Sequence, residues 1–211
     1  MERGYNGNIM MKKEKTYYKM SEVKSQLKIL GFTGPSGCGK DTAARYLAET
    51  DPDKFNYIKL YTTRPQRDKD DDGYIFVSAS EFLKQIMNGE MLNAQEYNGW
   101  YYGLSKESLK ENCINVIPMS AEMVFQMREE CRNDYSLYII FIQTNDKQRL
   151  LHCLDRELQP NCYEICRRFL ADDDEYYTSG VMTKCNRSII NSYTPNFFAS
   201  VEEHSDHFLR F

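Results

Sequence analysis

Residues 34–42 read Gly34-Pro35-Ser36-Gly37-Cys38-Gly39-Lys40-Asp41-Thr42, between the apolar run 27–32 and the helix-forming run 43–47. A strand, a glycine-rich turn and a helix in this order are typical of a phosphate-binding loop. Its glycines let successive backbone N–H groups turn toward one anion, and the following helix directs the positive end of its dipole there. The pattern therefore predicts that residues 34–42 bind the phosphates of a nucleotide, with Lys40 supplying a mobile positive charge.

The loop departs from the usual pattern directly after its lysine. A Ser or Thr normally follows, and its hydroxyl binds Mg²⁺; here Asp41 follows, and Thr42 comes one place later. A carboxylate about 4 Å from a phosphate would be repelled by on the order of 4 kcal/mol at an effective dielectric of about 20. We therefore expect Thr42 to be the metal ligand, with Asp41 pointing outward or lying beyond the direct ligands of the metal.

Length and composition indicate one domain with room for small inserted lobes, because 211 residues with 41% hydrophobic content can bury a sizeable core. The net charge of −4 excludes a general attraction to nucleic acid or to an anionic membrane. No apolar run approaches the roughly 18 residues of a membrane span. We expect a cytoplasmic enzyme that acts on small nucleotides, as a monomer or homodimer, with no nucleic-acid or membrane partner.

The cysteines support that compartment. Their number is odd and their spacing shows no pairs: they are Cys38, Cys113, Cys131, Cys153, Cys162, Cys166 and Cys185. Scattered thiols suit a reducing environment better than a disulfide framework.

The first 26 residues show no clear hydrophobic periodicity, and no apolar stretch follows the lysines at positions 12, 13 and 15 to make a signal peptide. They are interpreted as a flexible leader. The fold is expected to occupy residues 27–211.

Two arginines follow the second predicted strand, residues 55–61. Arg64 and Arg67 lie three residues apart in a loop at the end of that strand. Guanidinium groups match the oxygens of a phosphate, so both can converge on one phosphate group. The acidic run after them, residues 68–72, is interpreted as a solvated surface loop.

The rest of the chain alternates between predicted helices and strands. Asn98-Gly99 between two strand-like runs indicates a hairpin. Ser120 is expected to cap a helix that reaches Cys131, with Met123, Val124 and Met127 in the core. Further helices are predicted at 80–88, at 105–112 and from Pro195 onward, and further strands at 113–119, 137–143 and 187–191.

Several motifs, taken in order, resemble those of guanylate kinases. They are the loop 34–42, Thr62-Thr63-Arg64-Pro65 with Arg67, Tyr74-x-Phe76-Val77, Glu81-Phe82, Gly89-Glu90 and Tyr101-Tyr102-Gly103. The resemblance is good from about residue 28 to 103 and traceable to about residue 191. It implies an α/β, P-loop nucleoside monophosphate kinase fold: a parallel sheet wrapped by helices, with an inserted monophosphate-binding lobe and a lid.

The resemblance also implies boundaries and chemistry. The core would comprise residues 27–61 and 113–211, the inserted lobe residues 62–112, and the lid about residues 146–164. The family transfers the terminal phosphoryl group of ATP to GMP with Mg²⁺, so ATP and Mg²⁺ are the expected cofactors and GMP or dGMP the expected acceptor.

Individual roles follow from the same resemblance. The contacts to the acceptor phosphate fall on Arg64, Arg67, Tyr74 and Tyr102. Near the lid, Arg149, Arg156, Arg167 and Arg168 are spaced so that some can close on the transferring group. The best matches to the family are Arg156 and Arg168, which with Lys40 are the predicted catalytic residues; surface salt bridges to nearby acidic residues are the alternative.

Base recognition is where the chain departs from the family. Asn93 stands where the family has a guanine-binding glutamate, and Leu60 and Leu104 stand at two serine positions. An aspartate position matches Pro118 or Ser120. A hydrogen bond to a charged group is worth about 1.5–3 kcal/mol, so the change at Asn93 alone could weaken guanine binding roughly ten- to 150-fold. An amide could instead bind adenine, cytosine or a modified base.

Three alternatives to a guanylate kinase therefore stay open. The first is a kinase of the same fold that acts on another nucleotide or on ribose 1,5-bisphosphate. The second is a non-catalytic guanylate-kinase-like binding module. The third is a P-loop nucleotide hydrolase or regulatory switch, which leaves the residues from Arg64 to Tyr74 unexplained.

Overall fold

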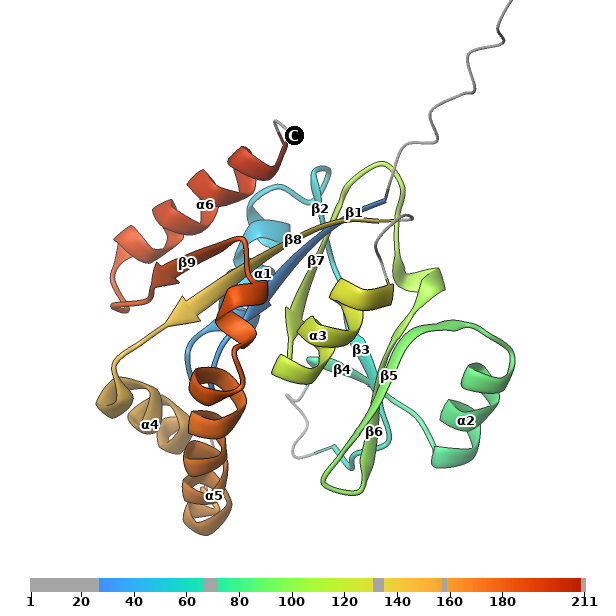
Figure 1. The fold of residues 1–211 in the computed structure, drawn as a ribbon, viewed down its shortest axis with the longest axis horizontal. Coiled ribbons are helices and arrows are strands. Elements are labelled where there is room, and N and C mark those ends of the chain that lie inside the picture. The colour runs from blue at the N-terminus through green and yellow to red at the C-terminus, as the bar shows by residue number, and fades with distance from the viewer. Residues whose placement is uncertain (1–26, 67–71, 131–134, 157–158, 210–211) are drawn as a thin grey trace, which may run out of the picture.

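Two β-sheets form the frame of the computed structural model, which describes residues 27–66, 72–130, 135–156 and 159–209 (Figure 1). One sheet has five strands and the other has four. The predicted leader, residues 1–26, lies outside the described residues, as does Arg67.

The five-stranded sheet is parallel throughout and has the strand order β2-β7-β1-β8-β9. Its strands are β2 (Phe55–Tyr57), β7 (Ile114–Met119), β1 (Leu27–Thr33), β8 (Tyr135–Gln143) and β9 (Arg187–Ile190). The central strands read as continuous apolar runs because helices cover both of their faces. The predictions of strands at 27–32, 113–119, 137–143 and 187–191 are confirmed.

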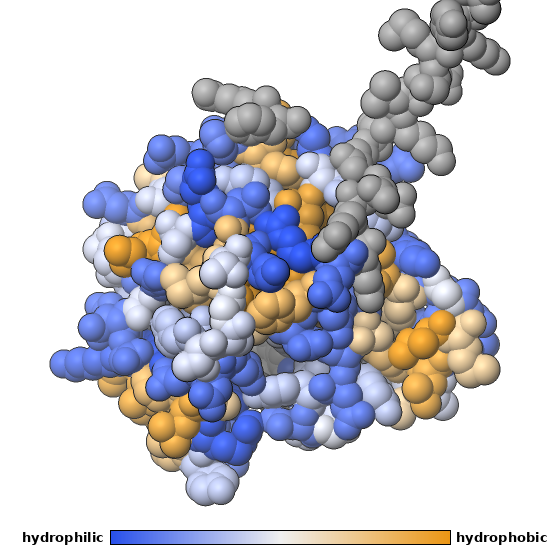
Figure 2. All heavy atoms as spheres, in the orientation of Figure 1, coloured by the Kyte–Doolittle hydropathy of each residue, from blue (hydrophilic) through white to orange (hydrophobic). Residues whose placement is uncertain are grey.

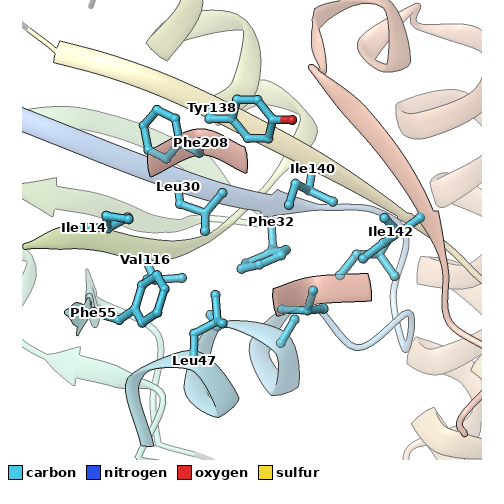
Figure 3. Packing of buried hydrophobic residues seen from close by; sticks show 14 of the residues in the cluster. Leu30, Phe32, Leu47, Phe55, Ile114, Val116, Tyr138, Ile140, Ile142 and Phe208 are labelled. Carbon is cyan, nitrogen blue, oxygen red and sulfur yellow. The ribbon is translucent and has the colours of Figure 1, made fainter. Parts of the chain in front are cut away.

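Helices cover the two faces of this sheet and bury alternate residues of its strands. Leu30 and Phe32 of β1 point toward α1 (Lys40–Thr50) and α6 (Pro195–Leu209), as Figure 3 shows. Ile29 points to the opposite face, where α3 (Ala121–Glu130) packs. The cap and the core residues predicted for α3 are confirmed: the backbone N–H of Met123 donates to Ser120 Oγ over 3.1 Å, and Met123, Val124 and Met127 are buried.

The four-stranded sheet projects beside the large one, on the right in Figure 1. Its order is β4-β3-β6-β5, with β4 (Tyr74–Phe76), β3 (Leu60–Thr62), β6 (Trp100–Ser105) and β5 (Met91–Tyr97). The hairpin predicted at Asn98-Gly99 is confirmed, with positive φ angles of 52° and 77°. Helix α2 (Ala79–Met87) begins with a capping box in which Ser78 and Glu81 satisfy each other's backbone N–H groups.

Two predicted elements are wrong. The single strand 55–61 is instead β2 and β3, which belong to different sheets: Ile58 still donates to the Val116 carbonyl over 2.9 Å, and the chain then crosses over. The helix 105–112 is only the short 3-10 turn η1 (Lys106–Ser108). The Asn115 side chain explains this, since it hydrogen-bonds both the N–H and the carbonyl of Lys110 at 2.9 Å and holds that backbone out of a helix.

The remaining elements follow β8. They are α4 (Asp146–Asp155), α5 (Cys162–Asp172), the π-helical turn η2 (Asp173–Thr178) and the 3-10 turn η3 (Val181–Lys184). Helices α4 and α5 lie near the carboxyl ends of β1 and β8, where the glycine-rich loop also lies (Figure 1). Among the described residues, no helix is both long and apolar enough to cross a membrane.

Candidate active site

The glycine-rich loop connects β1 to α1 and needs its glycines for two steric reasons. Gly37 and Gly39 have φ angles of 78° and 95°, a region that other residues rarely adopt. A Cβ atom on Gly37 would lie 2.4 Å from the Arg149 carbonyl oxygen, and one on Gly39 would lie 2.6 Å from Asn191 Nδ2. Side chains at these positions would therefore displace the loop from Arg149 and Asn191.

The loop carbonyls are held from the protein side. Asn191 Nδ2 donates to the Cys38 carbonyl over 3.0 Å, and the Tyr193 hydroxyl donates to the Gly37 carbonyl over 2.5 Å. The Cys38 side chain is fully buried and packs into the core with Phe197. These contacts fix the carbonyls behind the loop and preserve its tight curvature.

Lys40 begins helix α1 and keeps its charge. Its Nζ donates to the Gly34 carbonyl over 3.3 Å, so the side chain folds back along the loop. Burial works to lower the pKa of Lys40, but its neighbours outweigh burial and raise the pKa; they are Cys38, Tyr176, Asp41 and Asp172. The ammonium group is therefore available to pair with a phosphate at physiological pH.

Asp41 and Thr42 are both exposed in the first turn of α1. Burial is the main cause that raises the pKa of Tyr74, to about 12, and the negative charge of Asp41 adds to it. Lys40 acts on the same hydroxyl in the opposite sense. The loop and the strand β4 therefore face each other closely enough to interact electrostatically.

Three of the predicted acceptor residues converge in the four-stranded sheet. The guanidinium carbon of Arg64 lies 5.3 Å from the ring centre of Tyr74, whose ring contacts that of Tyr102 edge to face at 5.8 Å. Arg64 is only 5% exposed, and its Nη1 donates to the Pro65 carbonyl over 2.8 Å. A buried guanidinium beside two phenols offers several donors in one direction, which suits a monophosphate.

The positions predicted to contact the base form one row across this sheet. Asn93 of β5 lies opposite Leu104 of β6, and the register between β6 and β3 continues from Leu104 to Leu60. Leu60 in turn lies opposite Tyr74 of β4. Asn93, Leu104 and Leu60 are 4%, 0% and 8% exposed, so this row is packed into the protein. The Asn93 amide donates to Gln126 Oε1 of α3. At one end of the row, Asn93 and Gln126 therefore form a neutral pair of amide side chains, and the two leucines follow it along the row.

A second amide link, which was not expected from the sequence, connects the same strand to α3. Gln95 Nε2 donates to Ser120 Oγ over 2.9 Å. Asn93 and Gln95 lie within reach of α3 only because β5 packs against it, and no local pattern signals that contact. Together the two links fasten β5 to the N-terminal half of α3.

The predicted catalytic arginines lie at the end of α4 and on α5. Arg156 is exposed at the C-cap of α4, and Arg168 Nε lies 3.5 Å from Glu164 Oε1. The same carboxylate binds Arg167 through two hydrogen bonds of 2.7 and 2.8 Å. In this structure Glu164 therefore pairs with both arginines of α5.

Arg149, which the spacing grouped with the phosphoryl-binding arginines, is instead fully buried. Its Nη1 donates to Asp172 Oδ2 over 2.7 Å and its Nε to Asp146 Oδ1 over 2.8 Å. The guanidinium also lies over the Phe169 ring at 3.7 Å. Arg149 is thus committed to contacts within α4 and α5.

This arrangement defines a P-loop nucleoside monophosphate kinase fold. A parallel sheet carries a glycine-rich loop after its middle strand, and a smaller sheet beside it brings arginine and tyrosine side chains together. A solved structure of the same fold, the guanylate kinase from Anaplasma phagocytophilum, matches with a TM-score of 0.60 and 22% identity, over 89% of this chain and 87% of that one.

The sequence comparisons identify the family. The guanylate kinase family model matches residues 26–179, and the chain belongs to that family. Guanylate kinases of Streptococcus agalactiae serotype III (strain NEM316) and of Streptococcus pyogenes serotype M3 (strain ATCC BAA-595 / MGAS315) are each 38% identical over 100 residues, or 46% of this chain. The aligned part covers 48% and 47% of those proteins, so the chain spans about half the length of the curated relatives it matches.

Proposed function

We propose that this protein transfers the terminal phosphoryl group of ATP to a nucleoside monophosphate in a Mg²⁺-dependent reaction, with GMP or dGMP as the first candidate acceptor. One observation carries the proposal: the helix that begins with Lys40 binds Asp72, two residues before β4, through Arg45 over 2.7 Å, and Tyr74 of β4 sits beside Arg64 and Tyr102. A loop suited to a triphosphate and a cluster suited to a monophosphate thus share one site.

On the donor side, residues 34–42 would surround the β- and γ-phosphates with backbone N–H groups, and Lys40 would pair with their charge. The close packing behind Gly37 and Gly39 supports such a cradle, because it leaves the loop no room for side chains. Thr42 would supply the hydroxyl ligand. With Mg²⁺ held there, charge on the phosphate oxygens would be neutralised.

On the acceptor side, Arg64, Tyr74 and Tyr102 would hold the monophosphate, together with Arg67 outside the described residues. An acceptor phosphate is already an anionic nucleophile, so no general base is required. Catalysis would come from holding the two phosphates in line and from neutralising charge in the transition state.

The lid arginines would complete the site. Arg168 is paired with the partly exposed Glu164, and a phosphoryl group could replace that carboxylate as its partner. Arg156 stands at the end of α4, within the proposed lid of about residues 146–164. We place the core at residues 27–61 and 113–211 and the lobe at 62–112. The cytoplasmic location and the monomeric or homodimeric state belong to the same proposal.

The acceptor is tested with purified protein, ATP and Mg²⁺, and a panel of GMP, dGMP, AMP, CMP, UMP, dTMP and ribose 1,5-bisphosphate, with the products identified by mass. The proposal expects GMP or dGMP to be the best acceptor. Turnover of ATP without any acceptor would instead indicate a hydrolase, and nucleotide binding without any turnover would indicate a binding module.

A second candidate is a kinase of the same fold with a different acceptor. It is favoured by the buried row of Asn93, Leu104 and Leu60, which offers amide and aliphatic groups and no carboxylate at that end of the site. Preferred turnover of AMP, CMP or ribose 1,5-bisphosphate in the same panel would select it.

A further inference from the structure

A carboxylate from α5 reaches the glycine-rich loop. Asp172 Oδ2 accepts a hydrogen bond from the backbone N–H of Ser36 over 3.0 Å, and Asp172 Oδ1 accepts one from the Ser36 hydroxyl over 3.2 Å. The two residues are 136 positions apart in the chain. The contact therefore fixes both the backbone and the side chain of Ser36, at the start of the turn that surrounds the proposed phosphate site.

Arg149 of α4 fixes that carboxylate in turn. Its Nη1 lies 2.7 Å from Asp172 Oδ2, the same oxygen that accepts from the Ser36 N–H. The Arg149 side chain is fully buried, and Asp172 is only 4% exposed. Removal of one partner from a buried ion pair leaves the other charge uncompensated, so moving either side chain out of the pair is energetically unfavourable.

The backbone of α4 touches the loop as well. The Arg149 carbonyl oxygen lies so close to Gly37 that a Cβ atom added to this glycine would be only 2.4 Å from the oxygen. One residue of α4 thus contacts the loop through its backbone at Gly37 and, through Asp172, at Ser36. The first half of the loop is supported jointly by α4 and α5.

We propose that Asp172 is a positioning residue of the donor site: it holds Ser36, and through it the shape of the phosphate-binding loop, while Arg149 holds Asp172. The inference rests on the proposed function only in taking residues 34–42 as the donor site. The Arg149 guanidinium balances the Asp172 carboxylate, so the pair adds little net negative charge beside the donor phosphates.

The direct test is the affinity for MgADP, measured by calorimetry without any acceptor. Asp172→Ala removes both acceptors of Ser36 and should weaken MgADP binding about tenfold or more. Asp172→Asn keeps an oxygen that can accept from the Ser36 N–H, so it should retain most of the affinity. Asp174→Asn is the matched control, because Asp174 lies two positions further along the chain, is exposed, and has a carboxylate that accepts from the Thr178 hydroxyl over 3.4 Å; it should bind as the unmodified protein does.

A second variant separates positioning from stability. Arg149→Met combined with Asp172→Leu replaces the buried pair by apolar groups of similar size, a change that is often neutral for folding. This double variant should melt near the temperature of the unmodified protein and still bind MgADP about tenfold more weakly. Its KM for ATP should rise while its KM for the acceptor stays the same.

Unchanged affinity for MgADP in a folded Asp172→Ala or double variant would overturn the inference, and so would tighter binding, which would mean that the carboxylate opposes the phosphates. Because this test needs no turnover, a failure of the proposed reaction would appear separately, as intact MgADP binding with no acceptor phosphorylated.

Discussion

Lys40 is the residue on which the proposed donor site is expected to depend most. Its Nζ contacts the Gly34 carbonyl, and the raised pKa keeps it charged. Charge-assisted hydrogen bonds contribute about 1.5–3 kcal/mol each, so Lys40→Met should weaken MgADP binding roughly ten- to 150-fold.

Calorimetry with MgADP measures the effect of Lys40→Met. Lys147→Met is the control, because it makes the same chemical change at a lysine that is exposed on α4. Equal affinities for MgADP in the two variants would remove Lys40 from the donor site.

Tyr74 gives a prediction about pH. Burial raises the pKa of Tyr74 to about 12, whereas an ordinary tyrosine ionises near 10. A raised pKa means that the hydroxyl stays a neutral donor up to strongly alkaline pH, so its contribution to acceptor binding should not decline between pH 8 and about 10.5. Tyr74→Phe should raise the acceptor KM about three- to tenfold, in line with a net hydrogen-bond contribution of about 0.5–1.5 kcal/mol.

Steady-state kinetics across that pH range, compared between the unmodified protein and Tyr74→Phe, test this prediction. Tyr163→Phe on α5 serves as the control because its ring is 82% exposed. A loss of the Tyr74 contribution centred near pH 10 would show that the hydroxyl titrates as in water.

The residues of the site divide sharply by how well the sequence predicts them. Lys40 lies in a contiguous motif, and Arg64 is marked by its place at the end of a strand. Asp172 carries no such signal, because its contact with Ser36 joins residues 136 positions apart. The spacing groups Arg149 with the arginines near the lid that could reach the transferring group, because charge and spacing alone do not indicate burial.

The Asn115 side chain determines the backbone path of the segment after β6. Its Nδ2 donates to the carbonyls of Lys28 at 3.1 Å and Lys110 at 2.9 Å, and its Oδ1 accepts from Lys110 and Asn56 at 2.9 Å. Because Asn115 is fully buried, its removal leaves several polar groups without partners. Asn115→Ala should lower the free energy of unfolding by about 2–4 kcal/mol.

Urea denaturation of Asn115→Ala measures that loss. Asn88→Ala is the matched control: Asn88 is exposed at the end of α2, and its removal should change the free energy of unfolding by less than about 0.5 kcal/mol. A similar small effect at Asn115 would contradict the role given to its side chain.

The elements that the sequence predicts well are those with a local cause. Continuous apolar runs gave β1 and β8, Ser120 marks the start of α3, and Asn98-Gly99 marks the hairpin. The two wrong predictions have distant causes. The run 55–61 alternates like one strand but serves two sheets, and the helix expected at 105–112 loses its backbone partners to Asn115. Neither of these long-range contacts can be recognised from the pattern of a single sequence.

The face of the molecule shown in Figure 2 is mostly hydrophilic, and two of its apolar patches lie over α2 and over α4 and α5. Exposed apolar side chains in these helices include Leu83, Ile86 and Met87 in α2, Leu151 in α4, and Tyr163 and Leu170 in α5. The proposed site, between the loop and the four-stranded sheet, is made of different residues.

The proposed metal dependence concerns the whole reaction and gives a further prediction. Thr42 is exposed, and Mg²⁺ usually binds to a protein through few side chains and the phosphates of the substrate. Chelation with EDTA should therefore abolish phosphoryl transfer while leaving the melting temperature of the ligand-free protein unchanged. Scanning calorimetry and the transfer assay, each with and without EDTA, check both halves. A lower melting temperature in EDTA would indicate a structural metal.

Transfer of label from γ-labelled ATP to GMP, with and without the Lys40→Met change, is the most decisive experiment on the proposed reaction. We expect labelled GDP with the unmodified protein and at least a tenfold slower transfer with the variant. Release of the label as free phosphate only, or an equal rate in the two proteins, would contradict a site in which the glycine-rich loop delivers a phosphoryl group to the acceptor held by Arg64, Tyr74 and Tyr102.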